Sequence, residues 1–461
     1  MKANTKTYTM KNKYFLGLIG LTLNSLITST SIAQGTTISH DSLVKTVDAI
    51  KTDIENSKKL KVSGWVQAQY QIGEAKGIST FDGGNFLPGQ YNRFMIRRGR
   101  VKFTYTQKLS QYVLQVNATE RGVNLVEIFG KVTDPWTKSI TLTAGVMNRP
   151  FGFEIQQSSA DRETPERSRF TQILLPNERD LGSMLTFMPT KGSKLFGLKI
   201  DGGMYSGNGI YVPGTTSTGS TGNTTAAGLV DTDVYKDFMG RLSYKKSFNH
   251  DKFTFGIGGS HYNGGIAYQN NKTYNTMTAD ANGMQKWVMT DTVGGATSFT
   301  GKKAPRIYYA GEFQVSFKSF LGTTTFRGEY ITGTQSGSLT ENKSPNVTTV
   351  NTANTVSRQF NGGNFYFVQR IGKSKHEIAV KYEFYDPNTK VSAKDFGVGT
   401  SLKSAEVKYD MLGLGYNYYW DENIKFMVYY NFVQNEKGDG LAGFTKDVKD
   451  NVFTVRMQYR F

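Results

Sequence analysis

Strand-like segments, joined alternately by short and long connections, fill the chain from residue 60 to its last residue. Each segment is rich in aromatic and β-branched residues. Each is also about as long as a tilted strand that crosses a bilayer, roughly 9–11 residues plus its ends. The 16 predicted strands are 60–72, 93–107, 109–120, 123–133, 138–147, 181–189, 194–206, 234–248, 251–264, 306–319, 321–333, 359–372, 374–386, 405–419, 421–434 and 450–461.

The connections between these strands follow a regular order. Short turns alternate with long loops, with one exception, the tight link at Arg121 and Gly122. The long loops are 73–92, 148–180, 207–233, 265–305, 334–358, 387–404 and 435–449. Short turns at one end and long loops at the other are typical of a transmembrane β-barrel of the outer-membrane type. A soluble β-sandwich, the alternative for any single strand, has no physical reason to keep this order.

Side chains within the strands alternate between an apolar and a polar face. In the last strand every second residue from Phe453 to Phe461 is apolar, and the residues between them, from Thr454 to Arg460, are polar. Sixteen strands close a barrel too wide for side chains to fill, so the polar face should line water and the apolar face should contact lipid. The sequence therefore predicts an all-β fold, a 16-stranded antiparallel transmembrane β-barrel over 60–461.

The aromatic residue at the end of the last strand points to two partners. Alternating apolar residues that end in Phe461 resemble the signal that outer-membrane barrels present to their insertion machinery. We therefore expect outer-membrane lipid as one partner, and the insertion machinery as another through this strand.

Composition agrees with a β-rich membrane protein and excludes some chemistry. Tyr (26), Phe (30) and Gly (50) are frequent and Pro (10) is rare, as strands joined by polar loops require. The sequence contains no cysteine, which excludes disulfides, thiolate metal sites and cysteine nucleophiles. The formal net charge of +18 indicates a negatively charged partner, which could be nucleic acid, anionic lipid or an anionic solute.

The first 33 residues have the pattern of a secretory signal peptide. Four lysines precede an uncharged run over 14–27, and Ser31 to Ala33 supplies the small residues of a cleavage site. We expect removal of residues 1–33 and a mature chain that begins near Gln34.

A short N-terminal periplasmic segment is predicted over residues 34–59. Leu43, Val47, Ile50 and Ile54 recur at helical spacing, which predicts a helix with a narrow apolar seam. It could be a single amphipathic helix, or a short coiled coil that joins protomers.

Strand alternation points a set of basic residues into the predicted lumen. Acidic residues such as Glu127, Glu312, Glu329 and Glu383 point the same way, so each inward arginine could belong to a wall-stiffening ion pair or to an anion path. The inward basic residues are Arg98, Arg100, Lys102, Arg241, Arg306, Arg327, Lys381, Lys425, Arg456 and Arg460. Arg93 and Arg97 are expected near the rim, because alternation is less regular there.

The long loop at 148–180 differs from the other loops. It mixes arginines and acids with apolar clusters around Phe151, Phe153 and Ile173. A solvated loop does not need such clusters, whereas a loop folded inward against the barrel wall does. We therefore expect an inward-folded constriction loop that narrows the pore and sets its selectivity.

Several motifs resemble one family. The run from Arg93 to Val101, the run from Gly145 to Glu154, Glu166-Arg167-Ser168 and the run from Asn177 to Gly182 resemble the phosphate-selective porin O and P family. The resemblance implies a 16-stranded barrel, usually a homotrimer, with the loop after the fifth strand in the pore and an arginine-lined path for phosphate or polyphosphate. The residues carried over are Arg97, Arg98, Arg100, Arg149, Arg167 and Arg179. Acids in the loop nearly balance its arginines, and loops 207–233 and 265–305 carry no family signature, which leaves the solute open.

The expected function is that of an outer-membrane porin in a Gram-negative (diderm) bacterium, giving passive, anion-preferring diffusion of small solutes. The alternative is a structural or adhesion barrel that forms one subunit of a larger outer-membrane complex. The predicted pore-lining and anion-binding residues are Arg97, Arg98, Arg100, Lys102, Arg149, Arg167, Arg179, Arg241, Arg306, Arg327, Lys381, Arg456 and Arg460.

Enzymatic and nucleic-acid-binding functions are not expected. His40 lies in the N-terminal segment, His250 in a short turn, and His261 and His376 on the lipid-facing side of their strands, so no catalytic residue is predicted. The 26 residues from Gln34 to Lys59 are too few for the plug domain of a TonB-dependent receptor. No metal cluster, cofactor motif or nucleotide motif is present in the sequence.

Overall fold

The computed structural model describes residues 44–45, 47–49, 51, 58–207, 211–212, 215–216, 224–225, 228–229, 234–268, 272–291, 302–343, 354–397 and 400–461. The chain divides into two compact units, Met1–Lys58 and Lys59–Phe461. The described residues of the first unit are helical, and the predicted signal peptide lies outside the described residues. The boundaries proposed at residues 33 and 59 remain predictions. In the part of the chain that the structure describes, no helix has the length and apolar composition needed to cross a membrane.

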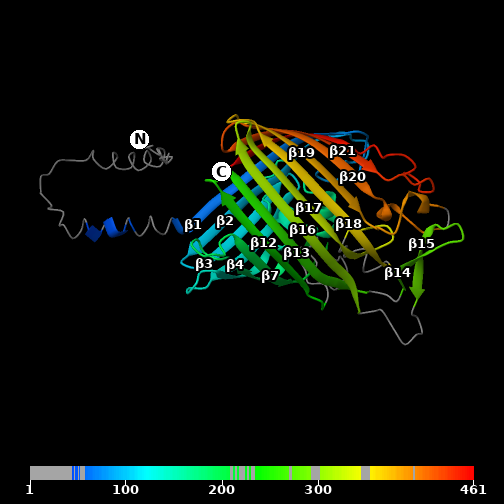
Figure 1. The fold of residues 1–461 in the computed structure, drawn as a ribbon, viewed down its shortest axis with the longest axis horizontal. Coiled ribbons are helices and arrows are strands. Elements are labelled where there is room, and N and C mark those ends of the chain that lie inside the picture. The colour runs from blue at the N-terminus through cyan, green and yellow to red at the C-terminus, as the bar shows by residue number, and fades with distance from the viewer. Residues whose placement is uncertain are drawn as a thin grey trace. The chain divides into compact units, whose positions relative to one another are not determined.

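The second unit is a closed antiparallel β-barrel of 16 strands (Figure 1). Strand β1 pairs with β2 on one side and with the last strand, β22, on the other, which closes the ring. The prediction of a 16-stranded antiparallel barrel is therefore confirmed. The strands of the ring are β1 (Leu60–Gly73), β2 (Asn92–Gln107), β3 (Ser110–Thr119), β4 (Gly122–Thr133), β5 (Ile140–Asn148), β6 (Arg179–Phe187), β7 (Leu198–Tyr205), β12 (Asp237–Phe248), β13 (Phe253–Ala267), β16 (Lys303–Ser319), β17 (Gly322–Gly337), β18 (Thr355–Arg370), β19 (His376–Asp386), β20 (Tyr409–Tyr419), β21 (Ile424–Asn435) and β22 (Val452–Arg460).

The two faces of the wall differ as strand alternation requires. In β21, Lys425, Met427 and Tyr429 are buried inside the barrel, whereas Phe426 and Val428 are exposed on the outside. Strand β22 alternates in the same way. An apolar outer face suits contact with hydrocarbon, and closure leaves no unpaired strand edge there.

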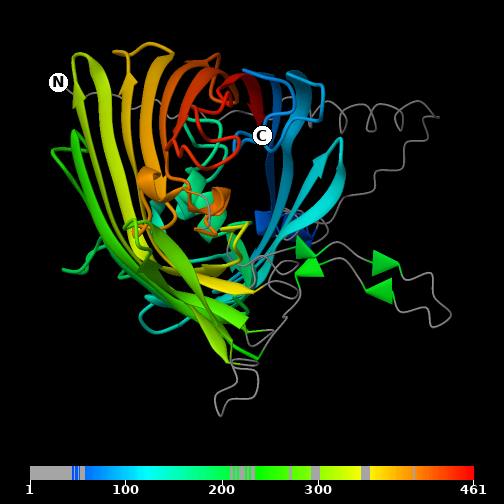
Figure 2. The ribbon, with the colours of Figure 1, turned by 90° about the vertical axis from the view of Figure 1, so that its right-hand side faces the viewer.

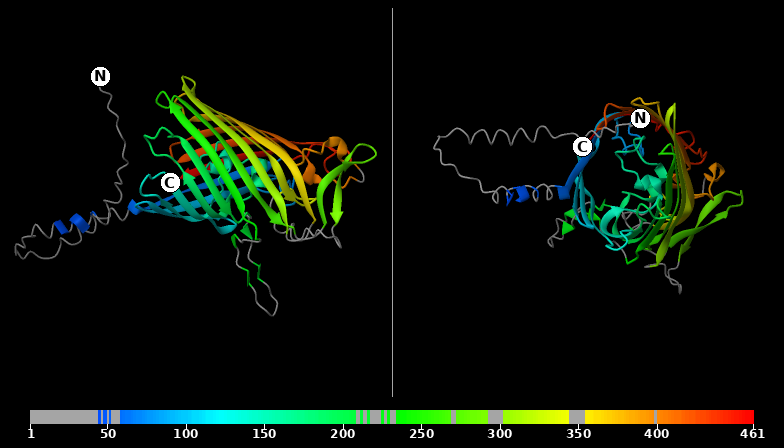
Figure 3. Two further views of the ribbon diagram at one scale, coloured as in Figure 1. Left: turned by 60° about the horizontal axis from the view of Figure 1, so that its bottom comes forward. Right: turned by 60° about the vertical axis from the view of Figure 1, so that its left-hand side comes forward.

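The wall is of uneven height. Strands β5 and β6 contain 9 residues each and β7 contains 8, whereas β13 contains 15, β17 and β18 contain 16, and β16 contains 17. Figure 3 shows the long green and yellow strands extending well beyond the rest of the ring. Strand β12 alone separates the short wall, β5 to β7, from the long wall, β13 to β18.

Two short helices occupy the interior of the ring (Figure 2). They are α3 (Gly152–Gln156) and α4 (Arg169–Leu174), both in the connection between β5 and β6. Phe151 and Phe170 from this connection join a buried apolar cluster with Tyr262, Tyr308 and Phe360 of the inner wall. Burial of these rings away from water stabilises the connection against the wall.

The connection between β13 and β16 contains a β-hairpin that is not part of the ring of 16 strands. It consists of β14 (Lys272–Ala279) and β15 (Gln285–Asp291), in a region for which the sequence predicted only a long loop. A register shift between Thr273 and Thr276 breaks the alternation that would have revealed the strand. Two residues of β14 pair with the start of β18 in parallel, which joins the hairpin to the wall.

Short elements complete the loop end. Two-residue strands are β8 (Tyr211–Val212), β9 (Thr215–Thr216), β10 (Thr224–Thr225) and β11 (Gly228–Leu229), and the 3₁₀ turns are η1 (Ala393–Asp395) and η2 (Ser404–Glu406). Trp287 of the hairpin packs with Val391, Phe396 and Leu402 in a buried apolar cluster, so the hairpin and the loop between β19 and β20 form one packed body.

Candidate functional site

One carboxylate of the inner connection binds three arginines of the wall. Glu166 lies 2.8 Å from Arg97, 2.8 Å from Arg98 and 3.0 Å from Arg456, measured between carboxylate oxygens and guanidinium nitrogens. Strand β2 carries a bulge at Arg97, because Arg98 pairs with Gln67 while Ile96 pairs with the next residue of β1. The bulge explains why two consecutive arginines reach the same interior carboxylate. It also explains the irregular alternation that suggested a rim position for Arg97.

A second carboxylate fixes α3 and α4 to each other and to the wall. Glu154 accepts hydrogen bonds from the hydroxyls of Ser168 (2.9 Å) and Thr171 (2.6 Å) and lies 3.4 Å from the ammonium of Lys381. Glu329 of β17 in turn accepts the backbone N–H of Phe153 at 3.0 Å. Buried carboxylates with several donors are well compensated, so these contacts hold the connection in one position.

Most of the other predicted basic residues are paired with acids. The pairs are Lys102 with Glu127, Arg167 with Glu178, Arg179 with Glu127 and Glu178, Arg241 with Glu312, Arg306 with Asp237, Arg327 with Glu163, Lys381 with Glu383, and Arg460 with Asp161. Of the thirteen predicted pore-lining residues, Arg100 and Arg149 have no ion-pair partner among the described residues. Arg149 is fully buried and donates to the carbonyl of Pro176, whereas Arg100 packs over the ring of Trp65.

A cavity opens between α4 and the loops after β1, β17 and β21. We call it the mouth cavity; its volume is about 860 Å³. The acids that line it are Glu178 and Asp450, and its basic residues are Lys76, Arg97, Arg167, Arg169, Lys343 and Lys449. Basic groups therefore outnumber acids by six to two, which gives this cavity a positive potential.

A smaller cavity of about 250 Å³ lies beside β2 and β6, and we call it the arginine pocket. Arg97, Arg98, Arg100 and Arg179 line it with one acid, Glu178. Four of the predicted site residues thus meet in one place. Arg241 and Arg460, by contrast, line neither this pocket nor the mouth cavity.

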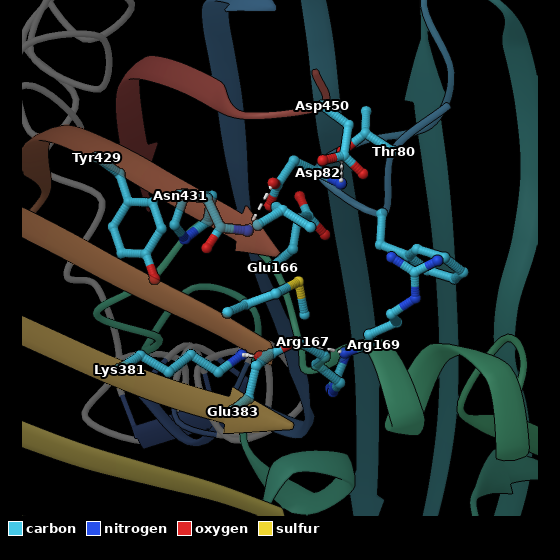
Figure 4. A pocket seen from close by; sticks show the side chains of 14 residues that line it. Thr80, Asp82, Glu166, Arg167, Arg169, Lys381, Glu383, Tyr429, Asn431 and Asp450 are labelled. Carbon is cyan, nitrogen blue, oxygen red and sulfur yellow. Dashed lines mark hydrogen bonds and ion pairs between the residues drawn. The ribbon is translucent and has the colours of Figure 1, made fainter. Parts of the chain in front are cut away.

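Figure 4 shows a polar pocket that adjoins the mouth cavity. Asp82, from the loop between β1 and β2, accepts a hydrogen bond from the amide of Asn431 at 2.8 Å. Asp450, from the loop between β21 and β22, lines the same space. Burial raises the pKa of Asp82 to about 6 and the pKa of Asp450 to about 7, against the opposing effects of Asn431 on the first and of Arg169 on the second.

Comparison with known proteins gives the family of the chain. The profile of the family described as phosphate-selective porin O and P matches residues 89–461. The chain belongs to this family. It is therefore an outer-membrane porin of a Gram-negative bacterium, as the sequence predicted. No match was found among curated protein sequences.

Solved structures similar to this porin are distant in sequence. The anion-selective porin from Comamonas acidovorans gives a TM-score of 0.48 at 9% identity, covering 87% of this chain and 99% of that chain. The outer membrane channel DcaP of Acinetobacter baumannii gives 0.48 at 10%, covering 87% and 97%. Salmonella typhi OmpF in complex with Daunomycin gives 0.46 at 12%, covering 87% and 97%.

Sequence reasoning missed several residues that shape the site of this porin. Glu166 was recognised only as part of a motif. Its contacts with three arginines form only when the barrel closes around the connection between β5 and β6. Asp82, Lys343 and Asp450 come from three loops that meet only in the folded chain. The run of acids and arginines from Asp161 to Arg167 was the available signal in the sequence. Among the described residues, no group of three or more His, Asp or Glu side chains could hold a metal ion.

Acidification is expected to increase the anion preference of the porin. Asp82 and Asp450 titrate at about 6 and about 7. Lowering the pH from about 8 to about 5 should therefore protonate both and remove two negative charges from the mouth cavity and the pocket beside it. Reversal potentials in a salt gradient at the two pH values measure the change. In the Asp82→Asn/Asp450→Asn variant the pH effect should be lost, while Asp439→Asn, an exposed acid outside this cluster, should retain it. A pH response that is unchanged in the double variant would contradict the assignment.

Proposed function

We propose that this porin gives passive, anion-preferring diffusion of small solutes, with phosphate or polyphosphate as candidate solutes. The observation that carries the proposal is the lining of the mouth cavity, where six basic residues meet two acids. A positively charged cavity with low-dielectric walls concentrates anions. Guanidinium groups also match the oxygens of phosphate in geometry.

The proposed path runs from the mouth cavity past the arginine pocket. Arg97 lines both spaces, so it connects them. Arg100 is the clearest candidate for direct contact with a solute, because no acid among the described residues neutralises it. Arg98 and Arg179 line the same pocket but share carboxylates, so they act on a solute with part of their charge offset.

The connection that contains α3 and α4 is proposed as the constriction. Its acids and bases are nearly balanced, and most of them are bound to the wall. Arg149 and Arg167 are buried, so we assign them a structural role. Selectivity is assigned instead to the exposed part of the arginine pocket.

Planar-bilayer recording of the purified porin tests the proposed function. We expect stepwise conductance and, in a potassium chloride gradient, a reversal potential of the sign that shows chloride preference. Added phosphate or polyphosphate should reduce the chloride current if it occupies the arginine pocket. Cation preference would overturn the proposal. Absence of conductance would instead favour the second candidate, a structural or adhesion subunit of a larger outer-membrane complex, for which the long packed loops offer surface.

A homotrimer is proposed as the assembled form, with the N-terminal segment as a possible contact between protomers. Deleting residues 39–58 is expected to reduce the assembly to smaller species, because the apolar seam would then be lost. Native mass spectrometry before and after the deletion measures this. An unchanged trimer would remove the coiled-coil role from the segment while leaving the barrel contacts.

A further inference from the structure

A pocket of about 320 Å³ lies between the β14–β15 hairpin and the outward face of the wall. Thr334 of β17 and Gln359 of β18 are cross-strand partners, and both line it. Their neighbours Gln335 and Arg358 are buried, and Gln335 bonds to Tyr385 at 2.8 Å on the inner side of the wall. Since successive residues of a strand point to opposite faces, Thr334 and Gln359 face outward.

The hairpin is held firmly enough to form a wall of this pocket. Trp287 of β15 donates its indole N–H to Glu406 at 3.0 Å, and Glu406 also binds Arg358 at 2.7 Å. Asn388 donates to the same carboxylate at 2.9 Å. All four side chains are buried, so the carboxylate is well compensated and the hairpin is fixed to the loop end. Figure 1 shows β14 and β15 at the end of the barrel that carries the long loops.

The chemistry of the lining favours a sugar. Trp287 and Tyr268 supply aromatic surface, and Asn275 and Gln359 supply amides that can both donate and accept hydrogen bonds. Amides complement hydroxyl groups, which have the same dual character. The volume lies at the lower end of the range for small-ligand sites, roughly 300–1,000 Å³, and suits one or two sugar rings.

The charge of the lining favours a phosphorylated sugar over a neutral one. Lys390, which is exposed, is the charged residue of the lining, and none of the described residues that line the pocket is acidic. The acid behind the lining, Glu406, is paired with Arg358. The ammonium of Lys390 therefore attracts a phosphate and disfavours a second cation.

The position of the pocket indicates which molecule would supply that sugar. Long loops mark the external end of an outer-membrane barrel, so the pocket lies on the outer side of the wall at the external surface. In a Gram-negative outer membrane, this is the level of the phosphorylated sugars of glycolipid headgroups. We propose that this pocket binds the phosphorylated sugar headgroup of an outer-leaflet lipopolysaccharide.

The test uses the full porin in detergent and the deacylated headgroup of lipopolysaccharide, a phosphorylated glucosamine disaccharide. Titration followed by tryptophan fluorescence should give saturable binding, since Trp287 lines the pocket. The Gln359→Ala/Lys390→Ala variant should bind about tenfold or more weakly, the effect of losing an ionic contact and an amide contact. The matched control is Lys394→Ala/Gln434→Ala, which removes an exposed lysine and an exposed glutamine that lie outside the pocket lining. It should bind like the unmodified porin.

Competition with intact lipopolysaccharide and with a neutral sugar shows which molecule the pocket recognises. Lipopolysaccharide should displace the disaccharide, and maltose should not. Failure of the unmodified porin to bind the disaccharide, equal loss in the control variant, equal binding of maltose, or failure of lipopolysaccharide to compete would each overturn the proposal. Unfolding temperatures of the two variants should match, which separates lost contacts from lost structure.

This inference is independent of the proposed solute path. Gln359 faces outward from β18 and Lys390 lies in the loop after β19, and neither lines the mouth cavity or the arginine pocket. The double variant should therefore keep the reversal potential of the unmodified porin in a bilayer. Loss of sugar binding with an unchanged reversal potential would support the proposal, whereas changes in both would contradict the separation of the two sites.

Discussion

The Glu166→Gln variant is expected to be more anion-selective and less stable than the unmodified porin. Glu166 is the carboxylate that Arg97, Arg98 and Arg456 share, and its removal leaves one more positive charge beside the arginine pocket. A unit charge about 4 Å from an ion in water changes the ion's energy by about 1 kcal/mol, which corresponds to roughly a fivefold change in preference. Breaking one side of a buried ion pair costs about 3–5 kcal/mol of folding free energy.

Reversal potential and thermal unfolding measure the two effects on the same preparation. Glu422→Gln, at an exposed turn between β20 and β21, is the matched control and should change neither. Unchanged selectivity in Glu166→Gln would show that ions do not pass near the three arginines. Unchanged stability would show that the carboxylate is not needed to hold the inner connection.

Replacing Gly152 by alanine is expected to detach the start of α3 from the wall and to raise the conductance. Gly152 has φ +53°, and a Cβ at this position would lie 2.1 Å from a carboxylate oxygen of Glu329. That carboxylate accepts the backbone N–H of Phe153 and anchors the helix. The left-handed backbone costs a non-glycine residue about 1–3 kcal/mol, and overpacking adds about 1–3 kcal/mol. A connection that leaves the wall narrows the lumen less, so single-channel conductance should rise and selectivity should fall.

Gly372→Ala separates backbone strain from the clash. Gly372 also has φ +53°, but no other atom lies within 4 Å of the position of its Cβ. The Gly372→Ala variant should lose only the folding free energy of the strained backbone, and its single-channel conductance should be unchanged. Equal conductance and equal stability in the two variants would show that contact with Glu329 does not hold the connection in place.

The barrel could be predicted from the sequence because each strand carries its own evidence. Period-two alternation in β22 or β16 is local, and the order of short turns and long loops needs no knowledge of which strands pair. The hairpin of β14 and β15 could not be predicted in this way, because a register shift interrupts its alternation.

The site was less predictable, since its contacts join distant parts of the chain. Arg456 and Glu166 are 290 positions apart, and only closure of the ring by β1 and β22 brings them together. Arg97 was expected at the rim because a bulge cannot be recognised from one strand alone. The sequence predicted which basic residues point into the barrel. It also predicted that several acids point inward, but it did not predict which arginine or lysine each acid would pair with.

The uneven wall has a consequence for the lipid around the porin. Eight or nine residues, rising about 3.4 Å each at a tilt of about 45°, reach only about 20 Å, which is less than the apolar band of about 25 Å. By strand length alone, β5, β6 and β7 are too short for the hydrocarbon of an unperturbed bilayer, whereas β16 spans it fully. This hydrophobic mismatch costs free energy for each ångström of compression. Protein packed against the short wall would remove that cost.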